Sequence, residues 1–328
     1  MQHPSALPAG ALPYPAMAPA FDPEVAREAL TGLRASPKTL PAKLFYDAAG
    51  CVLFDAITRL PEYYLTRTER ALLATVAPRL AAAAPRGAAL VEFGACDETK
   101  ALMLLAHMAA PAAYVPIDVA GPELAALRQR MAGSHPGLPV WPVAADFLRP
   151  LALPPEIAGR PRFGFFPGST IGNLEPAVAE RFLRQARAVL GPGAGFAVGV
   201  DLRKSPALLL PAYDDRAGVT AAFNRNLLAR LNREAAAEFD LAAFRHEARW
   251  NDAESRIEMH LVALRAQQVR IAGTSVRFAA GESIHTENSY KHTEEAFTAL
   301  AARAGWRRTQ FFTDPDRLVA IHLLEAEA

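Results

Sequence analysis

The amino-acid sequence predicts an α/β fold, in which a mostly parallel sheet ends in an antiparallel hairpin and a second, smaller α+β domain is attached. Between residues 88 and 201, short apolar runs alternate with helical patterns, which is typical of a parallel sheet covered by helices. Near the C-terminus, the turn cluster TDPDR separates two apolar runs and predicts a hairpin. Between residues 203 and 291 the alternation stops, which predicts an insertion that forms the second domain.

Composition excludes several classes of protein. The 328 residues carry 35 Lys and Arg against 34 Asp and Glu, so the clustered basic excess of a nucleic-acid-binding domain is not expected. With 51% hydrophobic and 21% charged residues, a disordered acidic protein is not expected either. Cys51 and Cys96 form no metal or redox spacing, and the absence of a disulfide framework favours the cytoplasm.

The N-terminal segment, residues 1–21, is rich in Pro and Ala and contains no Lys or Arg. Its prolines interrupt the apolar stretch that a secretory signal needs, so we expect a disordered tail. The chain holds no run of the roughly 20 apolar residues that would span a bilayer. We therefore expect no membrane association.

The first elements of the chain are helical. Asp22 is a plausible N-cap for the pattern DPEVAREALTGL, with Pro23 in its first turn. Loops around two apolar faces follow, and then a helix over residues 67–84. The run AALVEF, residues 88–93, reads as a strand that ends at Gly94, and helical spacing resumes over residues 100–108.

The alternation then continues to residue 201 and resumes after the insertion. Strands are predicted at residues 113–118, 140–144, 162–167 and 194–201, helices at residues 122–131, 175–190 and 294–304, and hairpin strands at residues 306–312 and 318–324. The insertion is predicted to be mostly helical over residues 207–243 and to form antiparallel strands over residues 245–265 and 269–279. We expect it to pack with residues 22–66 and to leave a cleft beside the parallel sheet.

Residues at the ends of three predicted strands suggest a nucleotide-type site. Open α/β sheets bind ligands beyond the carboxyl ends of their strands, where Gly94, Asp118 and the pair Asp146–Phe147 lie. A glycine lets the backbone approach a ligand, an acid suits a ribose diol, and an aromatic neighbour suits an adenine. GACDETK is not a full glycine motif, because Cys96 stands where a second glycine is usual. The terminal hairpin favours S-adenosylmethionine over NAD or FAD, since a plain dinucleotide fold would close with another parallel strand.

Longer motifs extend this interpretation to most of the chain. They are PKTLPAKLFYDAAGCVLFDAITRLPEYYLTRTE, FFPGSTIGNLEP, AYDDRAGVTAAFNRNLLARLN, SRIEMHL and IHTENSYKHT. From about Pro37 to the C-terminus, the chain resembles the S-adenosylmethionine-dependent L-histidine Nα-methyltransferases of ergothioneine biosynthesis. The resemblance implies a Rossmann-like class I methyltransferase core over residues 67–203 and 294–328, and a substrate-binding domain over residues 22–66 and 204–293. It also implies transfer of three methyl groups to the α-amino nitrogen of L-histidine, which gives hercynine.

The resemblance also implies which residues form the site. Six match the cofactor side: Tyr46, Gly94, Lys100, Asp118, Asp146 and Phe147. Seven match the substrate side: Tyr63, Gly168, Asn173, Tyr213, Met259, Glu287 and Ser289. Among the latter, Asn173 and Tyr213 are expected to hold the amino-acid carboxylate and amine, and Glu287 and Ser289 to read the imidazole. Met259 is expected to line the side-chain pocket and Tyr63 to reach the ring through water, while Tyr46 and Asn173 are the expected catalytic residues.

Several of these residues also have an ordinary structural interpretation, which the sequence leaves open. Tyr63 pairs with Tyr64 under a loop, Met259 belongs to the core of a strand, Asn173 caps the helix that follows, Glu287 is a solvated loop acid, and Lys100 is a solvated helix residue. For these positions, composition and spacing alone do not separate the two interpretations.

Other functions remain as alternatives. His285 and His292 suggest a metal, but they lack the Cys or carboxylate spacing of a structural zinc site, so we expect no metal. The same fold could act on another amino acid or a histidine derivative, or bind S-adenosylmethionine without catalysis, as a sensor does. We expect a monomer whose partner is the small molecule L-histidine.

Overall fold

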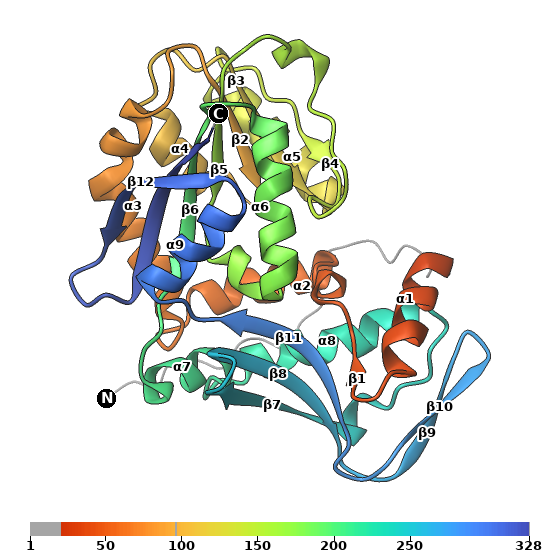
Figure 1. Cartoon of the computed structure of the whole chain (residues 1–328). Helices are drawn as coiled ribbons and strands as arrows, with labels where there is room; N and C mark the ends of the chain where they lie inside the picture. Colours follow the sequence, from red (N-terminus) through yellow and green to blue (C-terminus); the bar gives the residue numbers. More distant parts are fainter. Residues whose placement is uncertain (1–20, 96, 328) are drawn as a thin grey trace, which may run out of the picture.

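The computed structural model describes residues 21–95 and 97–327 (Figure 1). Its larger sheet has seven strands in the order β12-β13-β6-β5-β2-β3-β4. The strands are β2 (Ala89–Phe93), β3 (Ala113–Asp118), β4 (Val143–Ala144), β5 (Arg162–Phe166), β6 (Gly195–Asp201), β12 (Trp306–Thr313) and β13 (Val319–Ala326). Strand β2 lies inside the sheet and pairs in parallel with β3 and β5. The final strand, β13, lies antiparallel between β6 and β12, which confirms the predicted hairpin.

Helices cover both faces of this sheet (Figure 1). They are α3 (Tyr64–Ala82), α4 (Thr99–Leu105), α5 (Gly121–Ser134), α6 (Pro176–Leu190) and α9 (Glu294–Arg303). Side chains alternate along a strand, so Leu90 joins the apolar core under α3, α4 and α5, while Val91 joins a second core under α6 and α9. Both faces of β2 are fully buried, as expected for a central parallel strand.

A second sheet has four strands in the order β1-β11-β8-β7. They are β1 (Lys38–Thr39), β11 (Ser283–Tyr290), β8 (Arg256–Ala263) and β7 (Phe244–Asn251), and a separate ribbon is formed by β9 (Gln267–Ile271) and β10 (Thr274–Phe278). Around them lie α1 (Pro23–Leu33), α2 (Ala48–Thr58), α7 (Pro206–Tyr213) and α8 (Val219–Glu234). Because β1 pairs with β11, this sheet joins the N-terminal segment to the late insertion.

The structure corrects some predicted elements. The predicted strand regions 245–265 and 269–279 are each occupied by a hairpin, β7–β8 and β9–β10. Strand β11 was not predicted, because its sequence SIHTENSY carries polar side chains on both faces and shows no apolar alternation. Strand β4 is shorter than expected, since Pro142 has no N–H group to donate to a sheet.

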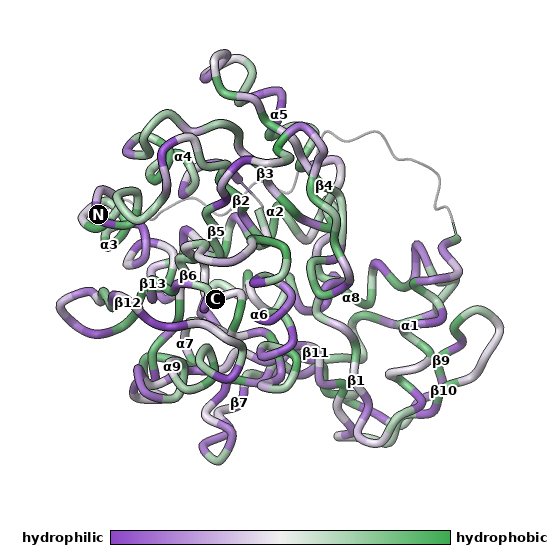
Figure 2. The backbone as a smooth tube through the Cα atoms, turned by 45° about the horizontal axis from the view of Figure 1, so that its top comes forward, coloured by the Kyte–Doolittle hydropathy of each residue, from purple (hydrophilic) through white to green (hydrophobic). Residues whose placement is uncertain are grey.

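The N-terminal helix illustrates how local sequence sets an element. The side chain of Asp22 accepts hydrogen bonds from the backbone N–H groups of Glu24 and Val25, so the predicted N-cap is confirmed. Hydrophobic and hydrophilic stretches alternate along α1, as a helix with one buried face requires (Figure 2). Residues 1–20 and Cys96 lie outside the described residues. Among the residues described, no helix is both long and apolar enough to cross a membrane.

Candidate active site

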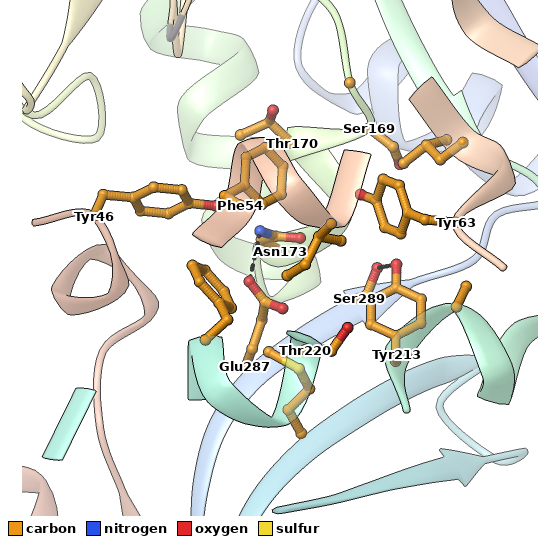
Figure 3. Close-up of a pocket in the computed structure, with 16 residues that line it drawn as sticks. Tyr46, Phe54, Tyr63, Ser169, Thr170, Asn173, Tyr213, Thr220, Glu287 and Ser289 are labelled. Atoms are coloured by element: carbon orange, nitrogen blue, oxygen red, sulfur yellow. Dashed lines mark hydrogen bonds between the residues drawn. The ribbon is translucent and has the colours of Figure 1, made fainter. Parts of the chain in front are cut away.

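A cavity lies where the carboxyl ends of the parallel strands meet the second sheet (Figure 3). The space between its walls, including the part open to solvent, is about 560 Å³. Its lining includes every residue expected on the substrate side together with Tyr46: Tyr46, Tyr63, Gly168, Asn173, Tyr213, Met259, Glu287 and Ser289. The remaining lining residues were not predicted: Phe54, Ile57, Leu65, Ser169, Thr170, Ala212, Thr220 and Phe223. The structure therefore brings together segments from almost the whole length of the chain.

The loop after β5 brings the larger sheet into this cavity. Gly168 has φ +81° and Ser169 has φ +56°, so the chain turns through two left-handed residues into the short 3-10 helix Thr170–Asn173. A Cβ atom on Gly172 would lie only 2.8 Å from the carbonyl oxygen of Tyr290. This close approach of the loop to β11 needs a glycine, and it brings Asn173 within reach of the second sheet.

Asn173 and Glu287 meet inside the cavity (Figure 3). The Nδ2 group of Asn173 donates to Oε1 of Glu287 over 3.1 Å. Asn173 does not cap the following helix, because Glu175 occupies that position. A β-bulge between His285 and Glu287 shifts the register of β11, after which Glu287 and Ser289 both face the cavity. Glu287 is thus a partly buried strand residue and not a solvated loop acid.

Burial controls the charge of the groups that line the cavity. Burial raises the pKa of Glu287 to about 7, although the Lys291 ammonium opposes this shift. Burial also raises the pKa of Tyr63 and of Tyr213 well above the ordinary value. Both phenols are therefore neutral, whereas Glu287 changes its charge near neutral pH.

Two hydroxyl groups form another polar part of the lining. The oxygens of Tyr213 and Ser289 lie 2.7 Å apart and share one hydrogen bond (Figure 3). We call Asn173, Tyr213, Glu287 and Ser289 the β11 wall. Met259, on the neighbouring strand β8, is 2% exposed and lines the same cavity.

Aromatic rings surround the remaining space. Tyr46 contacts Phe54 edge-on with ring centroids 5.8 Å apart, Phe54 contacts Tyr63 at 6.4 Å, and Tyr63 contacts Tyr213 at 6.4 Å. Phe223 packs against both Tyr46 and Phe54. Tyr63 therefore belongs to the cavity, whereas its neighbour Tyr64 turns away and donates to Asp201. Such rings exclude water and present negative π faces to a cation.

The carboxyl ends of the first parallel strands lie beside this cavity. Gly94 follows β2 with φ +71°, and a Cβ atom there would lie 3.7 Å from Phe147 and from Thr170, which lines the cavity. Asp118 ends β3 and accepts from the Ala120 N–H group, and Asp146 accepts from the Leu148 N–H group. Burial raises the pKa of Asp118. We call Gly94, Asp118, Asp146 and Phe147 the sheet edge.

Lys100 is tied to the cavity loop. Its Nζ atom forms a 2.8 Å ion pair with Oε2 of Glu69, which is only 1% exposed. The other carboxylate oxygen of Glu69 accepts from the N–H group of Gly168 over 2.7 Å. Lys100 is therefore not a freely solvated helix residue, and Glu69 holds both Lys100 and the turn at Gly168.

Comparisons with known proteins agree with this geometry. A family model described as "Histidine-specific methyltransferase, SAM-dependent" matches residues 25–326. This chain belongs to that family. It is 48% identical to the histidine N-alpha-methyltransferase of Mycolicibacterium smegmatis, over 88% of this chain and 91% of the relative. The corresponding protein of Mycobacterium tuberculosis is 44% identical over 88% of this chain and 90% of the relative. The seven-stranded sheet, with its reversed final strand, is the predicted Rossmann-like class I methyltransferase core.

A more distant relative has a different name. A 4-dimethylallyltryptophan N-methyltransferase of Aspergillus fumigatus is 26% identical over 90% of this chain and 92% of its own length. The match of the family model to residues 25–326 shows the family of this chain. Which substrate side chain the cavity accepts depends on the residues that line the cavity.

Two histidines in this family member lie in different surroundings. His285 lies with Glu258 and His260 such that one donor atom of each falls within 4.8 Å of the others. Glu258 is already bonded by the Arg256 guanidinium and by His260. His292 packs against Phe297 instead, with ring centroids 5.6 Å apart. His285 and His292 are therefore not brought together as a pair of metal ligands.

Sequence reasoning missed the charged residues behind the cavity of this methyltransferase. Glu69 occupies the apolar face of α3, and an acid at a buried helical position was a usable signal. Asp201 ends β6, where the ligand-binding edge of a parallel sheet lies. Lys291 follows β11 directly, and nothing in the local pattern distinguishes it from a solvated lysine.

Proposed function

We propose that this methyltransferase transfers three methyl groups from S-adenosylmethionine to the α-amino nitrogen of L-histidine. The product is hercynine, and we infer a role in ergothioneine biosynthesis. The observation that carries the proposal is the single cavity in which the loop after β5 meets the β11 wall beside the sheet edge. An acid, an amide and several hydroxyl groups line it, which suits a small zwitterion with a polar ring.

The sheet edge fits the proposed cofactor. The left-handed turn at Gly94 opens the backbone after β2, and Asp118 offers its carboxylate at the end of β3, where the Ala120 N–H group fixes one oxygen. We propose that Asp118 holds the ribose diol, Asp146 and Phe147 the adenine, and Lys100 and Tyr46 the methionine end. When bound, S-adenosylmethionine supplies a methyl group on a positively charged sulfur.

Residues of the chain would then position the nucleophile. A free α-amino group has a pKa of about 8, so it needs little help from a general base. Tyr46 and Asn173 orient its lone pair without adding charge, and the aromatic lining excludes water. Neutral partners also suit the last methylation, because the product is a quaternary ammonium that must leave. The π faces of Tyr63 and Tyr213 stabilise that cation while it is bound.

Selection of histidine falls to the β11 wall in this proposal. Glu287 accepts from one N–H group of a protonated imidazole, and Ser289 accepts from the other ring N–H group. A substrate without these polar atoms would leave buried groups unpaired, which typically costs orders of magnitude in kcat/KM. Met259 and Tyr63 complete the pocket for the ring, and Tyr213 with Asn173 holds the amino-acid group.

The two parts of the chain have separate tasks in this account. We propose that residues 67–203 and 294–328 bind the cofactor and that residues 22–66 and 204–293 bind the substrate. A cytoplasmic monomer that works without a metal remains our prediction, and the free thiol of Cys51 is compatible with a reducing compartment.

Two alternatives are tested by one experiment. The purified chain is incubated with S-adenosylmethionine and L-histidine, and S-adenosylhomocysteine and histidine products are quantified by mass spectrometry. The proposal predicts up to three S-adenosylhomocysteine molecules per histidine and a trimethylated product. A sensor would bind S-adenosylmethionine in titration calorimetry and release no S-adenosylhomocysteine. An enzyme for another amino acid would release it only when that amino acid replaces histidine.

A further inference from the structure

Lys291 is a buried cation whose hydrogen-bond donors are all used. Its side chain is 0% exposed, and its ammonium group donates to Asp201 Oδ2, to the Tyr213 hydroxyl and to the Ser289 hydroxyl, each over 2.7 Å. An ammonium group has three N–H donors and no acceptor. The oxygens of Tyr213 and Ser289 must therefore both accept from Lys291.

This arrangement fixes the direction of the remaining hydroxyl hydrogens. Tyr213 and Ser289 have one O–H each, and one of these is used in the 2.7 Å bond between them. Among the described residues, neither oxygen has a further hydrogen-bond partner, and both residues line the cavity. One O–H donor is thus left to point into the cavity, where it favours a ligand group that accepts hydrogen bonds.

The charged groups behind the β11 wall also favour a ligand group that accepts hydrogen bonds. Asp201 is 1% exposed and is shared by the ammonium groups of Lys291 and Lys204. Burial alone would raise the pKa of Asp201, but these two ammonium groups hold it below its ordinary value. Asp314, the other acid near Lys204, is engaged by the backbone N–H groups of its own loop. Two cations therefore share one carboxylate directly behind Tyr213 and Ser289.

We expect the ligand to supply the negative charge that balances the second ammonium group. A buried excess charge is costly unless a counter-charge accompanies it. Glu287 is the other ionisable acid on the cavity side, and it is hydrogen-bonded to Asn173. A carboxylate beside Tyr213 would meet both the free O–H donor and the positive charge of Lys291.

We propose that Lys291 is a positioning residue that fixes the Tyr213 and Ser289 hydroxyls and supplies the charge that selects substrates with a free α-carboxylate. The site would then accept a free amino acid. It would discriminate against the amino-acid amide, the amine that lacks the carboxylate, and a residue within a peptide. Lys291 acts through the two hydroxyls and does not itself touch the reacting nitrogen. The inference rests on the proposed histidine methyltransferase function.

The test compares L-histidine with L-histidinamide, which keeps the imidazole and the α-amine but lacks the negative charge. We expect the wild type to prefer histidine by about 100-fold in kcat/KM. The change Lys291→Met should lower kcat/KM for histidine by about 30- to 100-fold and that for histidinamide by no more than about threefold. Lys291→Arg, which keeps the charge, should retain most of the discrimination. A loss that is equal for both substrates would overturn the proposal, because a purely structural role predicts it.

Two controls keep the test decisive. Lys204→Met removes an equal charge from Asp201 without touching Tyr213 or Ser289, so the free O–H donor stays in place and the discrimination should fall by less than in Lys291→Met. If it abolished the discrimination as Lys291→Met does, the assignment to Lys291 would be wrong. If Lys291→Met fails to fold, Tyr213→Phe must show the same loss of discrimination. An inactive wild type would instead contradict the methyltransferase function itself.

Discussion

The two sides of the cavity are built in different ways. At the sheet edge, the carboxylates of Asp118 and Asp146 accept from backbone N–H groups only two residues further along the chain. In the β11 wall, the bond from Asn173 to Glu287 joins residues 114 positions apart, and that between Tyr213 and Ser289 joins residues 76 positions apart. The sheet edge is therefore a local consequence of strand ends, whereas the β11 wall exists only when the second sheet has packed.

This difference teaches where each property of the enzyme resides. A strand end can hold a cofactor in any protein that forms the parallel sheet, and it sets no preference for one amino acid. The β11 wall can change its polar groups without disturbing that sheet. We expect substitutions at the sheet edge to weaken only the binding of the cofactor, and substitutions in the β11 wall to weaken the binding of the substrate.

The largest effect is expected at Glu287. Replacing Glu287 with Ala removes the proposed acceptor for the imidazole N–H group, so kcat/KM for histidine should fall by about 100- to 1,000-fold. The preference for histidine over tryptophan or phenylalanine should shrink as well, and an unchanged preference would contradict the assigned role. Steady-state kinetics with each amino acid measures both. Glu258→Gln is the matched control, because Glu258 lies outside the cavity on the adjacent strand.

A smaller and differently placed effect is expected at Asp118. Asp118→Ala should raise KM for S-adenosylmethionine by about 10- to 100-fold, because the ribose diol would lose its proposed charged acceptor. KM for histidine should change by less than about threefold. Kinetics with each substrate varied in turn measures the two constants. A rise confined to the KM for histidine would show that the sheet edge and the β11 wall have been assigned the wrong ligands.

The buried carboxyl of Glu287 should also affect stability. Its pKa is raised from 4.5 to about 7 in the folded chain, so the folded state favours the protonated form. The contribution of protonated Glu287 to the stability of the folded state is fully present below pH 4.5 and is lost as the pH rises through 7. Glu287→Gln removes the cost of the buried charge, which amounts to at most about 3 kcal/mol.

The variant should therefore gain in Tm relative to the wild type between pH 5 and pH 8, by up to about 5 °C. Thermal unfolding of both proteins in the ligand-free state across this range is the measurement. A constant difference in Tm at all pH values would mean that the pKa of Glu287 is not raised.

The smallest effects are expected at two glycines. Gly94 has φ +71°, so Gly94→Ala should lower the free energy of unfolding by about 1 kcal/mol through backbone strain. It should also weaken the binding of the cofactor. Gly133 lies in helix α5, and a Cβ atom there would meet no other atom within 4 Å. Gly133→Ala should therefore stabilise by up to about 1 kcal/mol. Denaturant unfolding compares the two, and a stabilising Gly94→Ala would contradict the account of that turn.

The same contrast explains how much the sequence could predict. The alternation of strands and helices, the terminal hairpin and the strand-end residues Gly94, Asp118 and Asp146 follow from local patterns, and the structure has them at those strand ends. Substrate-side positions such as Asn173 and Glu287 were predicted from the family resemblance. The local sequence around them indicated a helix cap at Asn173 and a loop acid at Glu287. Their roles remain predictions, although the structure places them together in one cavity.

Other parts could not be predicted for physical reasons. Strand β11 has polar side chains on both faces, since one face lines the cavity and the other carries His285 beside His260. Lys291 becomes a buried cation only because β6 brings Asp201 to it from 90 positions away. No local pattern contains that information. The position of Cys96, where a second glycine was expected, lies outside the described residues.

Substrate selection by the β11 wall is tested most directly by mass spectrometry of the purified chain with S-adenosylmethionine and an equimolar pool of the twenty amino acids. The account predicts products that carry one, two and finally three added methyl groups on histidine, and no methylated form of any other amino acid. Methylation of tryptophan, or of any other amino acid in preference to histidine, would contradict it.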